Sequence, residues 1–350
     1  MPRQVWPFAT TQTAGREHLR HARSFSIVLG IRDALAASPA RWELARPVSV
    51  AHVSAQSWSA LAALALAIGL LHEGTMLRLL PVLLVVSSGC ATLGANALTK
   101  PMRVPIIGST SLPHREVSWK TADELTLRGW VFDPEGTPRG LVVLVHGKDI
   151  NRQHFSGEAA RFTKRGYQVL AFDQRAHGAS EGTRTTFGFH EVDDLKRGID
   201  LLGATRVVLI GESLGAAVAL QTAARDARVV GVVAGASFSD LSTIAAEHRP
   251  FFFNDATFAE ATKLAESESG FHVADISPAR DAANISAPVL LLHGTRDTFI
   301  DPAHSKRILA SVKNGSVVWL EGVGHIDVLV HAESWDRIER WMSEKVDASS

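Results

Sequence analysis

Mostly apolar runs of strand length alternate with amphipathic stretches between residues 115 and 346. A run without polar alternation is typical of a strand that is buried on both faces of a parallel sheet. Five such runs lie at 141–145, 167–172, 207–210, 229–233 and 289–292. Helical spacing of apolar residues recurs between the runs, as in 192–202. The pattern therefore predicts an α/β fold with a mostly parallel sheet and helices on both faces.

The two ends of this region complete an expected domain of residues 112–346. Segments 116–119 and 125–132 are typical of an antiparallel hairpin, 316–320 predicts a last strand, and 334–346 predicts a closing amphipathic helix. Further helices are expected at 156–165 and 214–224.

Residues 237–276 form an insertion ahead of the strand at 289–292, and Phe251, Phe252 and Phe253 stand out in it. One interpretation is a short cap that folds over a site and supplies an apolar pocket. The other is an aromatic turn that packs into the core. The sequence leaves both open.

The strand at 207–210 runs into Gly211-Glu212-Ser213-Leu214-Gly215 and then into a helix of small residues. A serine on a sharp strand-to-helix turn, with glycine two positions away on each side, is the nucleophile-elbow pattern. The glycines are needed because a Cβ at either position would clash where the helix passes close to the strand. The pattern predicts that Ser213 is exposed at the carboxyl edge of the sheet, beside a helix N-terminus that favours negative charge.

Polar residues follow the other strands at the same edge, where sites in such sheets lie. The short motifs that they form are His146-Gly147, Asp173-Gln174-Arg175-Ala176-His177-Gly178-Ala179-Ser180, His293-Gly294-Thr295-Arg296-Asp297 and Gly322-Val323-Gly324-His325. Together with the elbow, these motifs resemble those of the esterase/lipase and lysophospholipase-like members of the α/β-hydrolase superfamily. The resemblance covers roughly residues 115–346, and the chain order of Ser213, Asp297 and His325 is that of this superfamily.

The resemblance implies a Ser-His-Asp triad that cleaves carboxylic esters through an acyl-enzyme, as enzymes of class EC 3.1.1 do. Ser213 would be the nucleophile, His325 the general base and Asp297 the acid that orients the histidine. His304 and His331 compete for the second role. Asp240 and Asp301 compete for the third.

The oxyanion hole would use backbone N–H groups. Leu214, directly after the nucleophile, would give one, and the resemblance assigns the second to Lys148, with Asp149 as the alternative. Asp173, His177 and His293 are expected to be structural. Peptidase, thioesterase or acyltransferase activity is an alternative on the same fold, and a non-catalytic binding protein is a second.

Composition limits the partners of the chain. The 36 basic and 36 acidic residues cancel, and the sequence has no long basic run, so nucleic acid is not an expected partner. The single cysteine excludes an internal disulfide framework. We expect a small-molecule ester substrate and neither a cofactor nor a metal ion. The oligomeric state stays open.

Residues 1–111 are expected to be an N-terminal extension outside the fold. Within them, residues 76–90 have a short basic start, an apolar run at 79–86 and small residues before Cys90. This order resembles a bacterial lipoprotein signal, although Ser87 stands where Leu or Val is usual. The resemblance predicts lipidation of Cys90, anchoring to a membrane, and a periplasmic or outer-membrane location in the cell envelope; the alternative is the cytoplasm.

Such a signal belongs at the start of a protein, so Met76 would be the true start and residues 1–75 would not be translated. A genuine N-terminal extension is the alternative.

Overall fold

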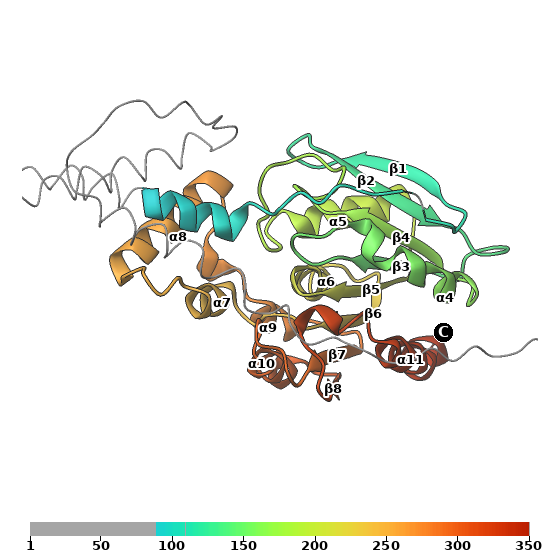
Figure 1. Cartoon of the computed structure of the whole chain (residues 1–350). Helices are drawn as coiled ribbons and strands as arrows, with labels where there is room; N and C mark the ends of the chain where they lie inside the picture. Colours follow the sequence, from blue (N-terminus) through green and yellow to red (C-terminus); the bar gives the residue numbers. More distant parts are fainter. Residues whose placement is uncertain (1–88, 109, 350) are drawn as a thin grey trace, which may run out of the picture. The chain divides into compact units, whose positions relative to one another are not determined.

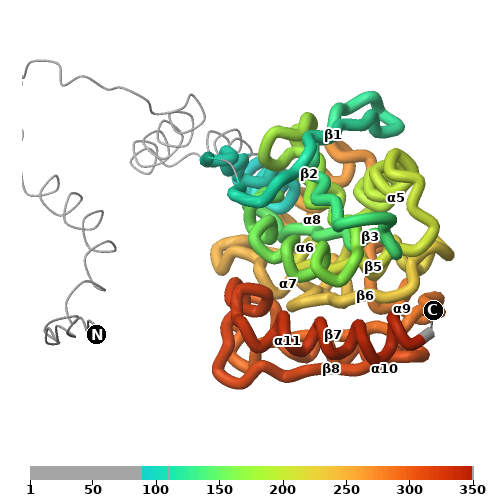
Figure 2. The backbone as a smooth tube through the Cα atoms, turned by 90° about the vertical axis from the view of Figure 1, so that its right-hand side faces the viewer, coloured from blue at the N-terminus to red at the C-terminus, as the bar shows by residue number. Residues whose placement is uncertain are grey.

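An eight-stranded sheet organises the computed structural model, which describes residues 89–108 and 110–349 (Figure 1). The strands stack in the order β1-β2-β4-β3-β5-β6-β7-β8, from β1 at the top of Figure 2 to β8 at the bottom. β2 is antiparallel to β1 and β4, and all other neighbours are parallel. Their bounds are β1 Arg115–Lys120, β2 Thr126–Phe132, β3 Leu141–Val145, β4 Gln168–Asp173, β5 Val207–Glu212, β6 Val229–Gly235, β7 Val289–Gly294 and β8 Gly315–Leu320. The expected mostly parallel α/β sheet is confirmed.

Successive side chains of the central strands enter opposite faces, which explains why these strands are apolar at every position. In β3, Leu141, Val143 and Val145 pack into one core, whereas Val142 and Leu144 pack into the other. The first core is covered by α5, α6, α9 and α10, and the second by α4 and α11, on the left and right of the sheet in Figure 1. The bounds of these helices are α4 Ala159–Thr163, α5 Glu191–Leu201, α6 Leu214–Ala223, α9 Pro278–Ala282, α10 Ala303–Ser311 and α11 Ala332–Trp341.

Two expected helices differ from the pattern. The one expected at 156–165 is a 3₁₀ turn, Arg152–Glu158, followed by the short α4. Gly157, a poor helix former, lies where the two meet. The closing helix begins at Ala332 and continues beyond Trp341 as a π turn, Met342–Val346.

Residues 89–108 belong to the fold, which corrects the expected boundary at residue 112. Residues 89–99 form a helix, and the extended chain after it is held by side chains of the domain. The Arg103 guanidinium donates to the backbone carbonyls of Gly178, Ser180 and Gly182. The segment has no period-2 or strand-length pattern of its own, so no local pattern predicts these contacts.

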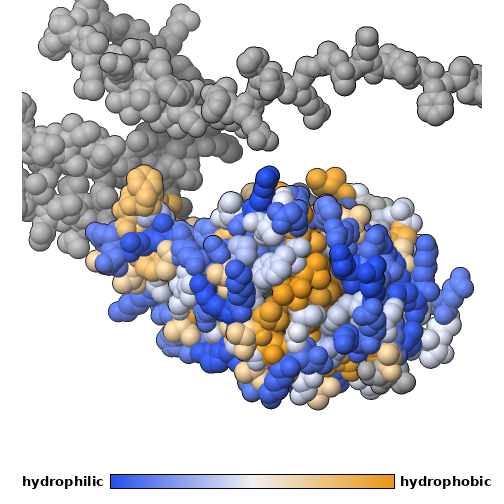
Figure 3. Space-filling model, turned by 90° about the horizontal axis from the view of Figure 1, so that it is seen from below, coloured by the Kyte–Doolittle hydropathy of each residue, from blue (hydrophilic) through white to orange (hydrophobic). Residues whose placement is uncertain are grey.

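β8 is an edge strand with one unpaired side. Seen from below, a strip of hydrophobic residues crosses this face of the molecule between hydrophilic areas (Figure 3).

Across residues 89–108 and 110–349, no helix is long and apolar enough to cross a lipid bilayer.

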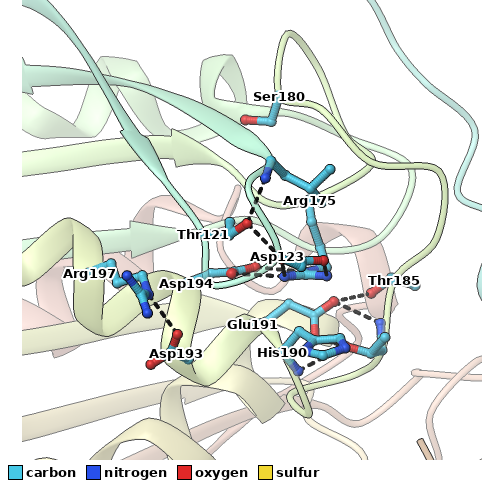
Figure 4. Close-up of polar contacts among 12 residues, drawn as sticks. Thr121, Asp123, Arg175, Ser180, Thr185, His190, Glu191, Asp193, Asp194 and Arg197 are labelled. Atoms are coloured by element: carbon cyan, nitrogen blue, oxygen red, sulfur yellow. Dashed lines mark hydrogen bonds and ion pairs between the residues drawn. The ribbon is translucent and has the colours of Figure 1, made fainter. Parts of the chain in front are cut away.

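A buried cluster of charges fixes the loop after β4 (Figure 4). The Arg175 guanidinium makes two hydrogen bonds to the Asp194 carboxylate, at 2.6 and 2.9 Å, and two more to Asp123 in the β1–β2 turn. Burial alone would lower the pKa of Arg175, but these carboxylates raise it above its ordinary value. At the first residue of α5, the buried Glu191 carboxylate accepts four hydrogen bonds from the same loop, donated by Thr185, Thr186 and Gly188. The cluster joins the hairpin, the loop and α5.

Replacing Arg175 with methionine should lower the free energy of unfolding by about 3–5 kcal/mol, because it leaves the Asp194 carboxylate buried without its partner. The matched control is Arg197→Met on α5 (Figure 4), whose ion pair with Asp193 is about half exposed. Its loss of unfolding free energy should be much smaller, because water already solvates both charges of an exposed ion pair. Urea denaturation of the three proteins measures both values, and equal losses would contradict the prediction.

Candidate active site

Ser213 lies on the turn between β5 and α6 in a strained backbone conformation, with φ 53° and ψ −116°. Both flanking glycines are required by close backbone contacts. A Cβ on Gly211 would lie 2.3 Å from the Gly215 carbonyl oxygen, and one on Gly215 would lie 2.0 Å from the Val145 carbonyl oxygen. The Ser213 N–H donates to the Gly235 carbonyl on β6 at 2.8 Å. The turn is therefore held between the ends of β3 and β6.

The structure brings Ser213, His325 and Asp297 into one hydrogen-bonded chain. His325 Nε2 lies 3.1 Å from Ser213 Oγ, and His325 Nδ1 lies 2.8 Å from Asp297 Oδ2. Since the Asp297 carboxylate can only accept, Nδ1 carries the proton and the Nε2 lone pair faces the serine hydroxyl. The imidazole is thus set to take a proton from Ser213.

The loop after β7 holds Asp297 ionised. Its Oδ1 accepts the N–H groups of Phe299 and Ile300 at 2.9 and 2.8 Å, and His293 Nε2 lies 3.3 Å from Oδ2. Burial would raise the pKa of Asp297, but the hydrogen bonds from His293, His325 and Ile300 hold it well below its ordinary value. His293 is itself buried and accepts from Ser305 at Nδ1, so it is a packed loop residue beside the acid.

The competing residues lie elsewhere. His304 is buried, with Nδ1 on Ser239 and Nε2 on Glu247, and His331 precedes α11. Asp240 accepts from Ser239 and Ser277, while Asp301 accepts the Ala303 N–H at the start of α10.

Glu212, the residue between Gly211 and Ser213 in the elbow, also supports the site. Sequence reasoning did not predict this role. The buried Glu212 carboxylate lies 3.1 Å from His154 Nε2 and accepts the Leu329 N–H at 3.3 Å, four residues beyond His325. It therefore ties the His325 loop to the base of the elbow. The available signal was a charged residue at the end of an otherwise apolar strand.

The turn after β3 lies against the serine, since a Cβ on Gly147 would be 3.4 Å from Ser213 Cβ. Lys148 and Leu214, the two expected backbone donors, both line the same cavity as Ser213. Leu214 is the first residue of α6, a position whose N–H has no partner within the helix. Asp149, the residue after Lys148, has a positive φ of 65°.

The N-terminal segment holds this turn in place. The Met102 N–H donates to Asp149 Oδ1 at 2.6 Å, and Lys148 Nζ donates to the Ala97 carbonyl at 3.2 Å. Beneath the turn, the His146 ring lies between the Gly147 carbonyl and the Gln174 N–H. Burial keeps the pKa of His146 well below its ordinary value, so the ring is neutral.

A mainly apolar cavity of about 720 Å³ opens above Ser213 and His325. Its walls come from three parts of the chain: the strand ends, the 237–276 insertion and helix 89–99. The larger apolar lining residues from the last two are Leu98, Phe238, Leu241, Ile244, Phe253 and Phe258. Within the described part of the chain, no group of three or more His, Cys, Asp or Glu side chains is arranged to hold a metal ion.

The insertion folds over the site as a cap, with α7 Leu241–Glu247 and α8 Asp255–Ser269. The three consecutive phenylalanines divide: Phe253 is buried, whereas Phe251 and Phe252 are 98% and 64% exposed. Phe253 lines the cavity and packs with Ala91 and Ala261 rather than into either core of the sheet, as the cap interpretation expects.

Helix 89–99 completes the cap and packs against Phe253 and α8. A Cβ on Gly94 would lie 2.7 Å from the Phe253 ring and 2.9 Å from Ala261 Cβ, so the glycine permits this close packing. Cys90 is partly buried against the same residues. Of the expected signal at 76–90, residues 76–88 lie outside the described residues.

Comparisons with known proteins agree with the α/β-hydrolase fold. A sequence model described as the alpha/beta hydrolase family matches residues 142–341. The uncharacterised proteins YqkD of Bacillus subtilis and Rv2307c of Mycobacterium tuberculosis are 25% and 28% identical, over 60% and 69% of this chain and 70% and 83% of their own. The esterase Pf2001 of Pyrococcus furiosus is 26% identical with a TM-score of 0.58, over 70% of this chain and 99% of its own. An enol-lactonase of Burkholderia xenovorans shares the fold, with 18% identity and a TM-score of 0.50, over 65% of this chain and 100% of its own.

The low pKa of Asp297 gives a pH-dependent contribution to stability. A carboxyl group whose pKa is lower in the folded state stabilises the fold above its unfolded-state pKa, about 3.9, and loses that contribution as the pH falls. The difference in unfolding free energy between the wild type and Asp297→Asn should therefore be constant above about pH 5. Below about pH 4, the unfolding free energy of the wild type should fall relative to that of the variant. Urea denaturation from pH 3 to 7 measures it; a difference that does not change over this range would contradict the prediction.

Proposed function

Since the chain belongs to the alpha/beta hydrolase family, we propose that it is a serine hydrolase that cleaves carboxylic esters through an acyl-enzyme intermediate. The observation that carries this proposal is the hydrogen-bonded chain of Ser213, His325 and Asp297 at the floor of an apolar cavity. The similarity to the esterase Pf2001, at 26% identity, supports it.

In the acylation step, Ser213 Oγ attacks the ester carbonyl carbon while His325 Nε2 takes the hydroxyl proton. The carbonyl oxygen becomes an oxyanion, and the N–H groups of Lys148 and Leu214 would stabilise it from beside Ser213. The Asp297 carboxylate stabilises the imidazolium that forms. The carbon–oxygen bond to the alcohol then breaks, and His325 gives its proton to the leaving oxygen.

In the deacylation step, water replaces the alcohol. The oxygen of the water molecule attacks the acyl carbon while His325 takes a proton from that water. The same two N–H groups would stabilise the second oxyanion. Its collapse returns the proton to Ser213 Oγ and releases the carboxylic acid. The free enzyme is restored with all protons balanced.

The apolar walls favour esters with a hydrocarbon acyl chain over aminoacyl amides, because a polar peptide would lose hydrogen bonds to water without replacement. A panel of p-nitrophenyl esters with acyl chains of two to twelve carbons, run beside aminoacyl p-nitroanilides and acyl thioesters, tests this choice. Faster turnover of the anilides or the thioesters would favour a peptidase or a thioesterase. No turnover at all, with no reaction with a fluorophosphonate probe, would favour a non-catalytic binding protein.

Replacing Ser213 with alanine should lower kcat for p-nitrophenyl esters by a factor on the order of 10⁴–10⁶ and abolish fluorophosphonate labelling. The matched control is Ser239→Ala. Ser239 also contacts a histidine, at 2.8 Å from His304 Nδ1, but it is fully buried and does not line the cavity. The control should keep its labelling and most of its activity. Loss of labelling in the control alone would assign the nucleophile to Ser239.

The contact between Met102 and Asp149 predicts a role for the N-terminal segment in catalysis. Asp149→Ala removes the acceptor for the Met102 N–H and puts a less tolerant residue at a positive φ, so the Lys148 N–H should move. We expect kcat to fall by about tenfold or more with KM little changed, because misplacement of a transition-state donor costs rate more than binding.

Asp149→Asn is the control for this variant. Asparagine keeps an acceptor oxygen and tolerates positive φ, so its kcat should stay within about threefold of the wild type. Equal losses of kcat in both variants would contradict a positioning role for the contact.

A further inference from the structure

The mouth of the cavity is bordered by exposed apolar side chains. Phe299 and Ile326 both line the cavity, and they are 53% and 74% exposed, so they lie where the cavity meets solvent. Phe299 follows the acid Asp297, and Ile326 follows the base His325. Single exposed apolar residues are common, but several that gather around one opening indicate an interaction surface.

The cap continues this apolar border. Arg249 and Pro250 line the cavity, and Phe251 and Phe252 follow them directly, with their rings packed against each other at 5.3 Å. His248 directly precedes Arg249, and the centroid of its ring lies 4.3 Å from that of Phe299. This contact joins the cap segment to the Phe299 side of the mouth. Hydrophobic side chains are visible on the surface of the cap end, on the left of Figure 3.

Charge around the mouth is balanced. Arg249 pairs with the highly exposed Asp255 and stacks on Phe258, so it adds no net charge to the border. Lys148 and Asp149, which also line the cavity, pair with each other at 3.6 Å, so the charged residues along the cavity have no dominant sign. This border suits a lipid surface without net charge better than an acidic or basic partner.

The course of the chain points to the same partner. The described structure begins with helix 89–99, whose first turn packs beside Phe253, next to Phe251 and Phe252. The sequence immediately before it contains the apolar run 79–86, and Cys90 lies in the first turn. An attachment to a membrane through either feature would hold the cap, and with it the cavity mouth, close to the bilayer.

We infer that Phe251 and Phe252, with Phe299 and Ile326, form a docking surface that inserts into the surface of a phospholipid bilayer. The docked mouth lets the acyl chain of a lipid ester pass from the bilayer into the cavity without crossing water. The substrate class is therefore esters of membrane-resident acyl chains, and this part of the inference rests on the proposed ester hydrolysis. The insertion itself does not.

A kinetic comparison tests the route of the substrate. Phe251→Ser/Phe252→Ser and the control Leu201→Ser are compared on p-nitrophenyl butyrate in solution and on p-nitrophenyl palmitate held in phosphatidylcholine vesicles. Leu201 is similarly an exposed apolar residue, 49% exposed, but it lies near the start of β5, at the opposite end of the strand from Ser213.

The double variant should lose at least about tenfold in rate on the vesicle substrate and keep its rate on the soluble ester within about twofold. The control should match the wild type on both. An equal loss on both substrates, or no loss on the vesicles, would overturn the inference.

A binding measurement tests the insertion without catalysis. In the full chain with Ser213→Ala, Phe251→Trp and Leu201→Trp are compared for fluorescence quenching by vesicles of brominated phosphatidylcholine, after subtraction of the Ser213→Ala parent. Quenching of the tryptophan at 251 and not at 201 supports insertion, even if no ester is hydrolysed. Binding to vesicles without quenching at 251 would assign the attachment to the N-terminal residues alone and overturn the inference.

Discussion

The close approach of the β5–α6 turn to the end of β3 is the contact on which the site depends. The backbone at Gly215 passes so near the Val145 carbonyl that no Cβ fits, and this contact forces Ser213 into a backbone conformation that few residues adopt. The strained conformation persists because the turn is held on both sides by the ends of the buried central strands β3 and β6. The other functional groups are then placed relative to Ser213 by neighbouring strand ends: β3 for Lys148, β7 for Asp297 and β8 for His325.

Buried charge around this turn is matched by local donors. Asp297 sits among two backbone N–H groups and two histidines, and Glu212 bridges His154 and the Leu329 N–H. The Asp297 carboxylate fixes the loop after β7, and the Glu212 carboxylate fixes the loop that follows His325. Farther from the site, the Arg175 cluster does the same for the loop after β4, which contacts the N-terminal segment through Arg103. Polar networks, more than apolar packing, therefore set the loop geometry at the carboxyl edge of the sheet.

The segment 89–108 changes how the site is understood. It supplies one wall of the cavity through Leu98 and restrains the Lys148–Asp149 turn through Ala97 and Met102. A catalytic domain that began at residue 112 would lack both. The same helix links the start of the described chain to the cap, so any attachment of the N-terminus acts directly on the cavity mouth.

The sequence alone determined the strands, the mostly parallel sheet, the elbow and the chain order of the polar residues, because these follow from local periodicity and from steric rules within a few residues. It also predicted His325 as the base and Asp297 as the acid among close competitors. Only the tertiary structure decided that His304 is turned to Ser239 and Glu247, that Glu212 holds the His325 loop, and that helix 89–99 closes the cavity. These contacts join residues that are far apart in the chain, or depend on which way one side chain turns. No periodic pattern records such contacts, because they arise only when the sheet brings its loops together.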